Sequence, residues 1–132
     1  MKKYLHSTAK IIFSIILVLP TLGTTGIFPE ATRDLYNTDA AFAFIQTLTV
    51  TSYIMYMMAA VHILALYALW TRREVVAALL VLPITFNVVG FHLMLDGGLL
   101  TGGASLGNLM LLINLYLLYI HRDKLQTLAK PD

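Results

Sequence analysis

The sequence predicts an all-α fold, an integral membrane bundle of four antiparallel transmembrane helices with both the N- and C-termini in the cytoplasm. Of the 132 residues, 58% are hydrophobic and 12% are charged, against about 45–50% and about 25% in soluble globular domains. The charged residues leave four uncharged runs, at residues 11–29, 40–71, 75–95 and 97–121. Since about 20 apolar residues cross a bilayer, each run is long enough to span it.

The third observation is an unequal division of basic residues between the two sides. Only Arg33 lies between the first and second runs, and no basic residue lies between the third and fourth. The other eight flank the runs on the opposite side: Lys2, Lys3, Lys10, Arg72, Arg73, Arg122, Lys124 and Lys130. Because short loops rich in Lys and Arg are retained in the cytoplasm, both termini are expected inside. Residues 29–41 and 96–104 are the expected outer loops of a single transmembrane domain covering residues 1–132.

The first two spans are expected at residues 11–28 and 42–70. Pro29 ends the first, and Thr38 or Asp39 can cap the helix that follows. The second span is longer than a bilayer requires, and Trp70 anchors its inner end at the interface. Residues 1–26 also have features of a secretory signal peptide, but no clean cleavage pattern is present, so we expect a retained helix.

The third and fourth spans are expected at residues 74–95 and 105–121. Pro83 lies inside the third span, and Ser105 can cap the fourth. Glycine pairs occur in the loop between them, but no phosphate-binding glycine motif accompanies them. The fourth span ends in an aromatic girdle followed by cations, which again indicates a membrane interface.

Composition also excludes several classes of function. The chain contains no cysteine, which excludes disulfides, thiolate metal sites and cysteine nucleophiles. The basic residues flank apolar runs instead of forming a stripe on a soluble face, so nucleic acid is not an expected partner. No nucleophile or metal cluster is evident, and these absences argue against an enzyme.

Candidate site residues are the few polar side chains inside the spans. Depth can be counted from the cytoplasmic ends of the spans at about 1.5 Å of rise per residue. His62 and Asn114 then lie at similar depth, and Asn87 and Asn108 lie at a second, deeper level. One interpretation is interhelical hydrogen bonding, with Asn87 facing Asn108. The other is a small pocket able to hold a quinone carbonyl.

His92 and Asp96 form a separate candidate pair near the outer surface. They are four residues apart, so their side chains lie on the same helical face and can meet. Such a pair can accept a proton or bind a ligand, and a histidine near the interface can also simply extend its ring to water. His92 and His62 are about 15 Å apart in depth, too far to share a metal or a haem.

Part of the sequence resembles a known family. The stretch LPITFNVVGFHLMLDGG, residues 82–98, resembles the third-helix signature of the DoxX-like family of small four-helix membrane proteins, through Pro83, Asn87, His92 and Asp96. Residues 40–73 and 108–128 are similar to that family's second and fourth helices. The chain departs from the pattern at His62, where the resemblance leads us to expect an acidic residue.

The resemblance implies a multi-pass protein of the bacterial inner membrane. It also implies an accessory or anchoring subunit of a redox or stress-related assembly, whose partners are the lipid bilayer and other membrane or redox proteins. The alternative is a quinone-binding oxidoreductase component, with Asn87, His92, Asp96 and His62 as the cofactor-binding residues. A homo-oligomeric transporter of small molecules is less favoured, because no inverted repeat is visible.

Overall fold

The computed structural model describes residues 2–128, and every regular element among them is helical. The helices are α1 (Lys2–Gly23), α2 (Asp39–Thr51), α3 (Tyr53–Trp70), α4 (Glu74–Met94), α5 (Ala104–Ile120) and α6 (Arg122–Leu128), with a short 3-10 helix, η1 (Arg33–Leu35). The all-α prediction is therefore confirmed. Three segments are long and apolar enough to cross a membrane, Tyr4–Gly23, Tyr53–Trp70 and Glu74–Met94, and α5 is a shorter apolar helix.

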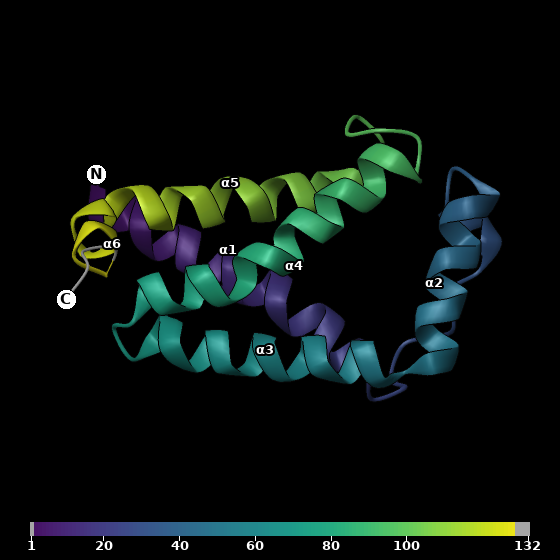
Figure 1. The fold of residues 1–132 in the computed structure, drawn as a ribbon, viewed down its shortest axis with the longest axis horizontal. Helices are drawn as coiled ribbons and strands as arrows, with labels where there is room; N and C mark the ends of the chain where they lie inside the picture. Colours follow the sequence, from purple (N-terminus) through teal and green to yellow (C-terminus); the bar gives the residue numbers. More distant parts are fainter. Residues whose placement is uncertain (1, 129–132) are drawn as a thin grey trace.

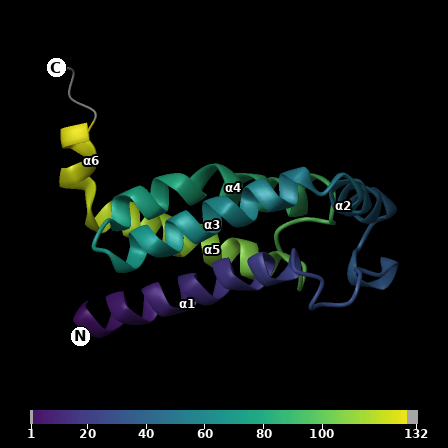
Figure 2. The ribbon, with the colours of Figure 1, turned by 90° about the horizontal axis from the view of Figure 1, so that it is seen from below.

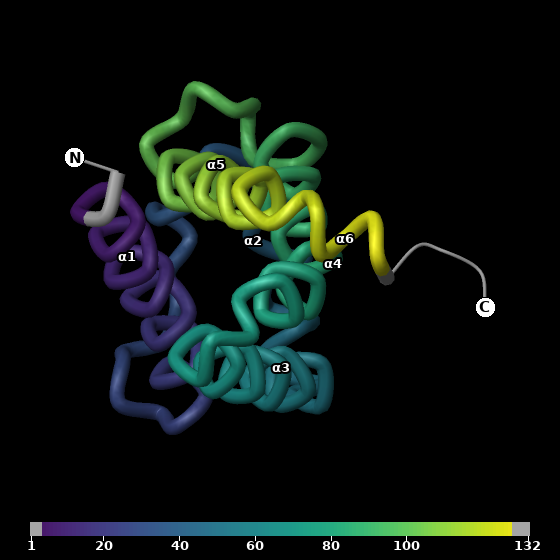
Figure 3. Tube along the Cα trace, turned by 90° about the vertical axis from the view of Figure 1, so that its left-hand side faces the viewer, coloured from purple at the N-terminus to yellow at the C-terminus, as the bar shows by residue number. Residues whose placement is uncertain are grey.

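Four helices, α1, α3, α4 and α5, run along the long axis in alternating directions (Figure 1). The view along that axis shows α1 between α3 and α5, with α4 on the other side of the same two helices (Figure 3). The start of α1, the α3–α4 turn and α6 lie at one end, called here the α6 end, where α6 projects away from the bundle (Figure 2). The opposite end carries α2, and is called the α2 end.

The continuous helix predicted over residues 42–70 is wrong. Ser52 separates α2 from α3 with φ 57° and ψ −38°, and α2 lies across the end of the bundle (Figure 1). The hydroxyls of Thr47, Thr49 and Thr51 donate to carbonyls four residues earlier in α2. Side chains that bond back to their own helix bend it and weaken it slightly, which favours a break directly after this run.

The other boundaries differ less from the prediction. The first helix begins at Lys2, before the expected residue 11, and ends at Gly23, before the expected residue 28. Helices α4 and α5 end within one residue of the expected positions. The side chain of Thr38 accepts a hydrogen bond from the Ala41 amide, so the predicted cap is confirmed. The cap predicted for α5 is wrong, since Ser105 lies inside the helix and donates to the Gly102 carbonyl.

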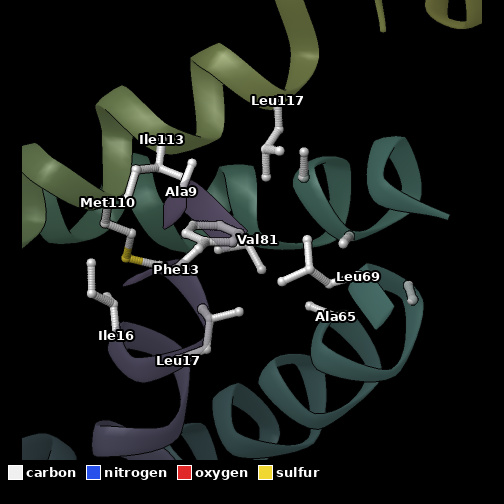
Figure 4. Close-up of a cluster of buried hydrophobic side chains, with 13 residues drawn as sticks. Ala9, Phe13, Ile16, Leu17, Ala65, Leu69, Val81, Met110, Ile113 and Leu117 are labelled. Atoms are coloured by element: carbon white, nitrogen blue, oxygen red, sulfur yellow. The ribbon is translucent and has the colours of Figure 1, made fainter. Parts of the chain in front are cut away.

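The core is an apolar cluster of side chains from α1, α3, α4 and α5 (Figure 4). Phe13 and Leu17 of α1 pack toward Leu69 of α3, Val81 of α4 and Leu117 of α5, all five of them buried. The cluster also contains four buried alanines, from α3 and α4, two helices that lie side by side: Ala65, Ala68, Ala77 and Ala78. Small residues let helix backbones approach one another, which is the usual packing of helices in a bilayer.

Candidate functional site

Polar side chains gather at three levels of the bundle. The Glu74 cluster, at the α6 end, contains His6, Lys10, Glu74 and His121. The Asp96 cluster, at the α2 end, contains Asn37, Thr38, His92 and Asp96. Between them lie three buried polar residues, His62, Thr85 and Asn114.

The Glu74 cluster joins three helices through one carboxylate. Lys10 Nζ donates to Glu74 Oε1 at 2.8 Å, and His121 Nε2 lies 2.7 Å from Oε2. The His6 ring nitrogen Nε2 is 3.2 Å from Oε1 and 3.1 Å from Oε2. Because His6 and Lys10 are one turn apart on α1, both reach the first residue of α4, while His121 directly follows α5. A single acidic side chain thus ties α1, α4 and the end of α5 together.

Sequence reasoning missed this cluster. It used residues 74 and 121 only to mark where spans end, counted Lys10 only as a basic residue that sets the topology, and assigned His6 no role. A signal was nevertheless present, because the three helix ends that carry these residues are predicted to lie at one membrane surface. One acidic residue among several basic and imidazole side chains at equal depth predicts an ion pair.

The Asp96 cluster attaches the end of α4 to the segment before α2. Asp96 is 1% exposed, and its Oδ1 accepts the Asn37 amide at 2.8 Å while Oδ2 lies 2.9 Å from His92 Nδ1. The Asn37 side chain donates to the Asp96 carbonyl at 3.1 Å, and the Thr38 hydroxyl donates to the Leu95 carbonyl. The predicted contact between His92 and Asp96 is confirmed.

The environment of Asp96 sets its protonation state. Burial raises the pKa of this carboxyl, but the hydrogen bonds from the Asn37 amide and from His92 outweigh burial and lower it below its ordinary value. Asp96 therefore accepts hydrogen bonds as an anion at neutral pH. Oδ1 holds the Asn37 amide and Oδ2 contacts His92 of α4, so Asp96 is a structural link between the end of α4 and the segment before α2.

The buried polar residues between the clusters are only partly satisfied. Asn114 Nδ2 donates to Thr85 Oγ1 at 3.3 Å, and the Thr85 hydroxyl donates to the Val81 carbonyl. His62 is 2% exposed, and neither of its ring nitrogens has a hydrogen-bond partner within residues 2–128. The expected layer of His62 with Asn114 is therefore not a hydrogen-bonded pair, since Thr85 is the partner of Asn114.

The expected pairing of Asn87 with Asn108 is wrong. Asn87 is exposed and donates to the carbonyl of Pro83 in its own helix at 2.9 Å. Asn108 instead donates to the Leu99 carbonyl, at 2.7 Å. An asparagine side chain can donate its hydrogen bond to a backbone carbonyl, so neither asparagine needs a partner on the facing helix. Of the four predicted site residues, the structure joins His92 to Asp96, exposes Asn87 and buries His62.

A cavity of about 380 Å³ opens at the α6 end. It is lined by residues 72–76, from the α3–α4 turn and the first turn of α4, and by Lys124 and Thr127 of α6. In the part of the chain that the structure describes, no three His, Asp or Glu side chains are arranged to hold a metal ion.

No family model, curated protein or solved structure matches the chain. The resemblance to the DoxX-like family stays a prediction, which rests on residues 82–98.

Proposed function

We propose that this chain is a multi-pass protein of the bacterial inner membrane, with α1, α3, α4 and α5 crossing the bilayer and both termini in the cytoplasm. Large apolar side chains are exposed on the outward faces of all four helices, among them Ile11, Ile15, Ile63, Leu64, Val76, Leu79, Leu112 and Leu115. In water such a surface promotes association, whereas lipid covers it without cost. The division of basic residues supports this orientation.

The absence of native cysteine allows this topology to be tested directly. Single cysteines at Ala31→Cys and Leu100→Cys, both in exposed outer segments, are expected to react with a membrane-impermeant maleimide in intact cells. Thr127→Cys in α6 is expected to react only after the membrane is permeabilised, and the same three variants labelled after lysis are the matched controls. Labelling of Thr127→Cys in intact cells would contradict the orientation.

We further propose that the protein is an accessory or anchoring subunit of a membrane redox or stress-related assembly, the role that the DoxX-like resemblance implies. The observation that carries this proposal is that buried polar side chains bond to other parts of the chain. Glu74 and Asp96 accept hydrogen bonds from side chains or amides distant in sequence, and Asn114 donates to Thr85 of another helix. These contacts fix the helices relative to one another, which suits a rigid membrane scaffold.

Native mass spectrometry of the chain, gently extracted from its own membrane, tests the subunit proposal. A mass equal to the chain plus a second polypeptide in fixed ratio is the expected result. An unrelated inner-membrane protein of similar size, carrying the same tag, is the control for incidental association. A bare chain, or an oligomer of this chain alone, would contradict the subunit role.

Quinone binding within the bundle is a second candidate function, and one observation favours it. His62 is buried with both ring nitrogens unpartnered in the described chain, and leaving such a group unbonded costs about 1–3 kcal/mol. A carbonyl oxygen of a quinone would accept a hydrogen bond from the ring and remove that cost. On this hypothesis His62, instead of Asn87 or His92, is the residue that contacts the ligand.

The quinone hypothesis predicts that purified His62→Leu retains less quinone than the wild-type protein. Bound quinone is measured by extracting it from each purified protein with organic solvent and quantifying it by its ultraviolet absorbance. Asn87→Leu is the matched control, because Asn87 is exposed and bonds only to its own helix. Circular dichroism shows whether both variants stay folded. Equal quinone retention in the two variants would contradict a role for His62.

A further inference from the structure

The cavity at the α6 end collects positive charge from two separate parts of the chain. Arg72 and Arg73 come from the α3–α4 turn, and Lys124 comes from α6. None of the three forms an ion pair with a carboxylate among residues 2–128. The first turn of α4 also lines the cavity, and the helix dipole adds partial positive charge there.

Glu74 is the acidic residue of the cavity wall, and its charge is already neutralised. Both carboxylate oxygens are within 3.2 Å of donors on α1 or after α5, with Lys10 as the cationic partner. The opposite charges of Glu74 and Lys10 cancel, so the net positive charge at the cavity comes from Arg72, Arg73 and Lys124. An anion is the ligand that such a wall favours, and guanidinium groups match the geometry of phosphate oxygens.

The position of the cavity distinguishes a lipid from a free anion. Trp70 ends α3 with 58% of its surface exposed, and Tyr119, 67% exposed, lies under Arg122 with 5.1 Å between the guanidinium carbon and the ring centre. Exposed aromatic side chains of this kind mark the level of lipid headgroups. The cavity is formed at the same helix ends.

An apolar stripe leads away from the cavity along α4. Val76 lines the cavity and is 45% exposed, and Leu79 and Leu80, three and four residues later, are 41% and 36% exposed. Residues at this spacing share one helical face. Cations at one end and an exposed apolar stripe running from it match the two parts of a phospholipid.

We propose that this cavity binds the phosphate group of an anionic phospholipid, held by Arg72, Arg73 and Lys124, with its acyl chains along Val76, Leu79 and Leu80. The proposal rests on the proposed membrane placement. Basic pockets at the cytoplasmic ends of transmembrane helices recognise anionic headgroups in this way. A zwitterionic headgroup binds less well, because its own cation shields the phosphate.

Native mass spectrometry of the full chain in detergent, with equal amounts of phosphatidylglycerol and phosphatidylcholine, tests this site. The wild-type chain is expected to retain phosphatidylglycerol preferentially. Arg73→Gln and Lys124→Gln are each expected to lower the bound phosphatidylglycerol roughly fivefold, because each removes one cation from the headgroup. Arg122→Gln is the matched control, since it removes a nearby cation that does not line the cavity.

Three results would overturn the proposal. Equal retention of the two lipids by wild-type protein would show no preference for an anionic headgroup. An equal loss in Arg122→Gln would show diffuse surface attraction instead of a site. Displacement of phosphatidylglycerol by inorganic phosphate at equal concentration would show that the ligand is a free anion and that the apolar stripe contributes nothing.

Folding and topology are controlled separately. Unchanged circular dichroism and melting temperature in the two cavity variants separate loss of binding from loss of structure. If cysteine labelling contradicts the cytoplasmic placement of α6 while the cavity variants still lose phosphatidylglycerol, the lipid site stands and only the proposed orientation fails.

Discussion

Lys10 Nζ lies 2.8 Å from Glu74 Oε1, a contact across 64 residues of sequence that joins α1 to the first residue of α4. His121 approaches the other carboxylate oxygen at 2.7 Å. The side chain of Glu74 is only 10% exposed, so water competes weakly for this carboxylate. The contact fixes the position of α1, which otherwise meets α3 and α5 mainly through apolar side chains.

Removing the charge of Glu74 is expected to destabilise the bundle. Glu74→Gln keeps the size of the side chain but leaves Lys10 without an anionic partner, and the loss should be about 1–3 kcal/mol in the free energy of unfolding. Denaturant titration in detergent micelles, followed by circular dichroism, measures it. Glu30→Gln, in an exposed loop, is the control. Equal stability of the two variants would show that the charge of Glu74 contributes nothing.

Stability is expected to fall in acid because of Asp96. The pKa of Asp96 is lower in the folded chain than its ordinary value, so the folded state stabilises the anion. The contribution is present above the ordinary carboxyl pKa of about 4 and is lost as the pH falls through the folded value.

The pH prediction is measured as the melting temperature of wild type and Asp96→Asn across a pH series. The variant cannot titrate at this position, so the difference between the two proteins should be largest near neutral pH and shrink below about pH 4. A constant difference at all pH values would rule out Asp96 as the titrating group.

Ser52 is expected to tolerate glycine better than any branched residue. Its φ of 57° is a conformation that side chains with a Cβ adopt at a cost. We expect Ser52→Gly to be neutral or to stabilise by up to about 1 kcal/mol, and Ser52→Val to destabilise the protein. Thermal unfolding of both variants measures the effect. A more stable Ser52→Val variant would mean that α2 and α3 form one continuous helix.

Gly107 is expected to be needed for the close approach of α5 to α4. A Cβ added there would lie 2.9 Å from Val88 Cγ1, and valine is stiff at its branched carbon. Gly107→Ala should therefore destabilise by about 1–3 kcal/mol, the usual cost of overpacking. Urea or thermal unfolding in micelles measures the change.

Two variants control the Gly107 prediction. Gly90→Ala, in α4 with open space around its added Cβ, should be neutral or stabilising because alanine favours helix. Val88→Ala combined with Gly107→Ala should recover part of the lost stability, as a double-mutant cycle would show. If the double variant is no more stable than Gly107→Ala alone, the contact with Val88 is not the cause.

Local sequence patterns predicted the helical parts of the fold well. The predicted span over residues 74–95 matches α4, Glu74–Met94, and the predicted 105–121 matches α5, Ala104–Ile120. Charged residues and glycine pairs end these runs, so the chain itself sets their length. The contact of His92 with Asp96 was predictable for the same reason, because four residues along one helix fix which side chains meet.

Long apolar runs do not reveal where a helix breaks inside them. The segment from residue 40 to 71 has no charge, glycine or proline, and nothing in its hydropathy separates α2 from α3. The break at Ser52 follows hydroxyl groups that bond within α2. Thr85 makes the same kind of bond inside the unbroken α4, so threonine hydroxyls alone do not predict a break and only the folded chain shows the turn.

The sequence by itself determined the apolar helices and the local pair at the end of α4. Tertiary structure alone decided which polar groups meet across helices, including Glu74 with Lys10 and Asn114 with Thr85. Depth in a bilayer follows from position along a helix, but a contact also needs the rotation of each helix about its axis. That rotation is set by packing of side chains such as Phe13, Val81 and Leu117, which no single helix contains.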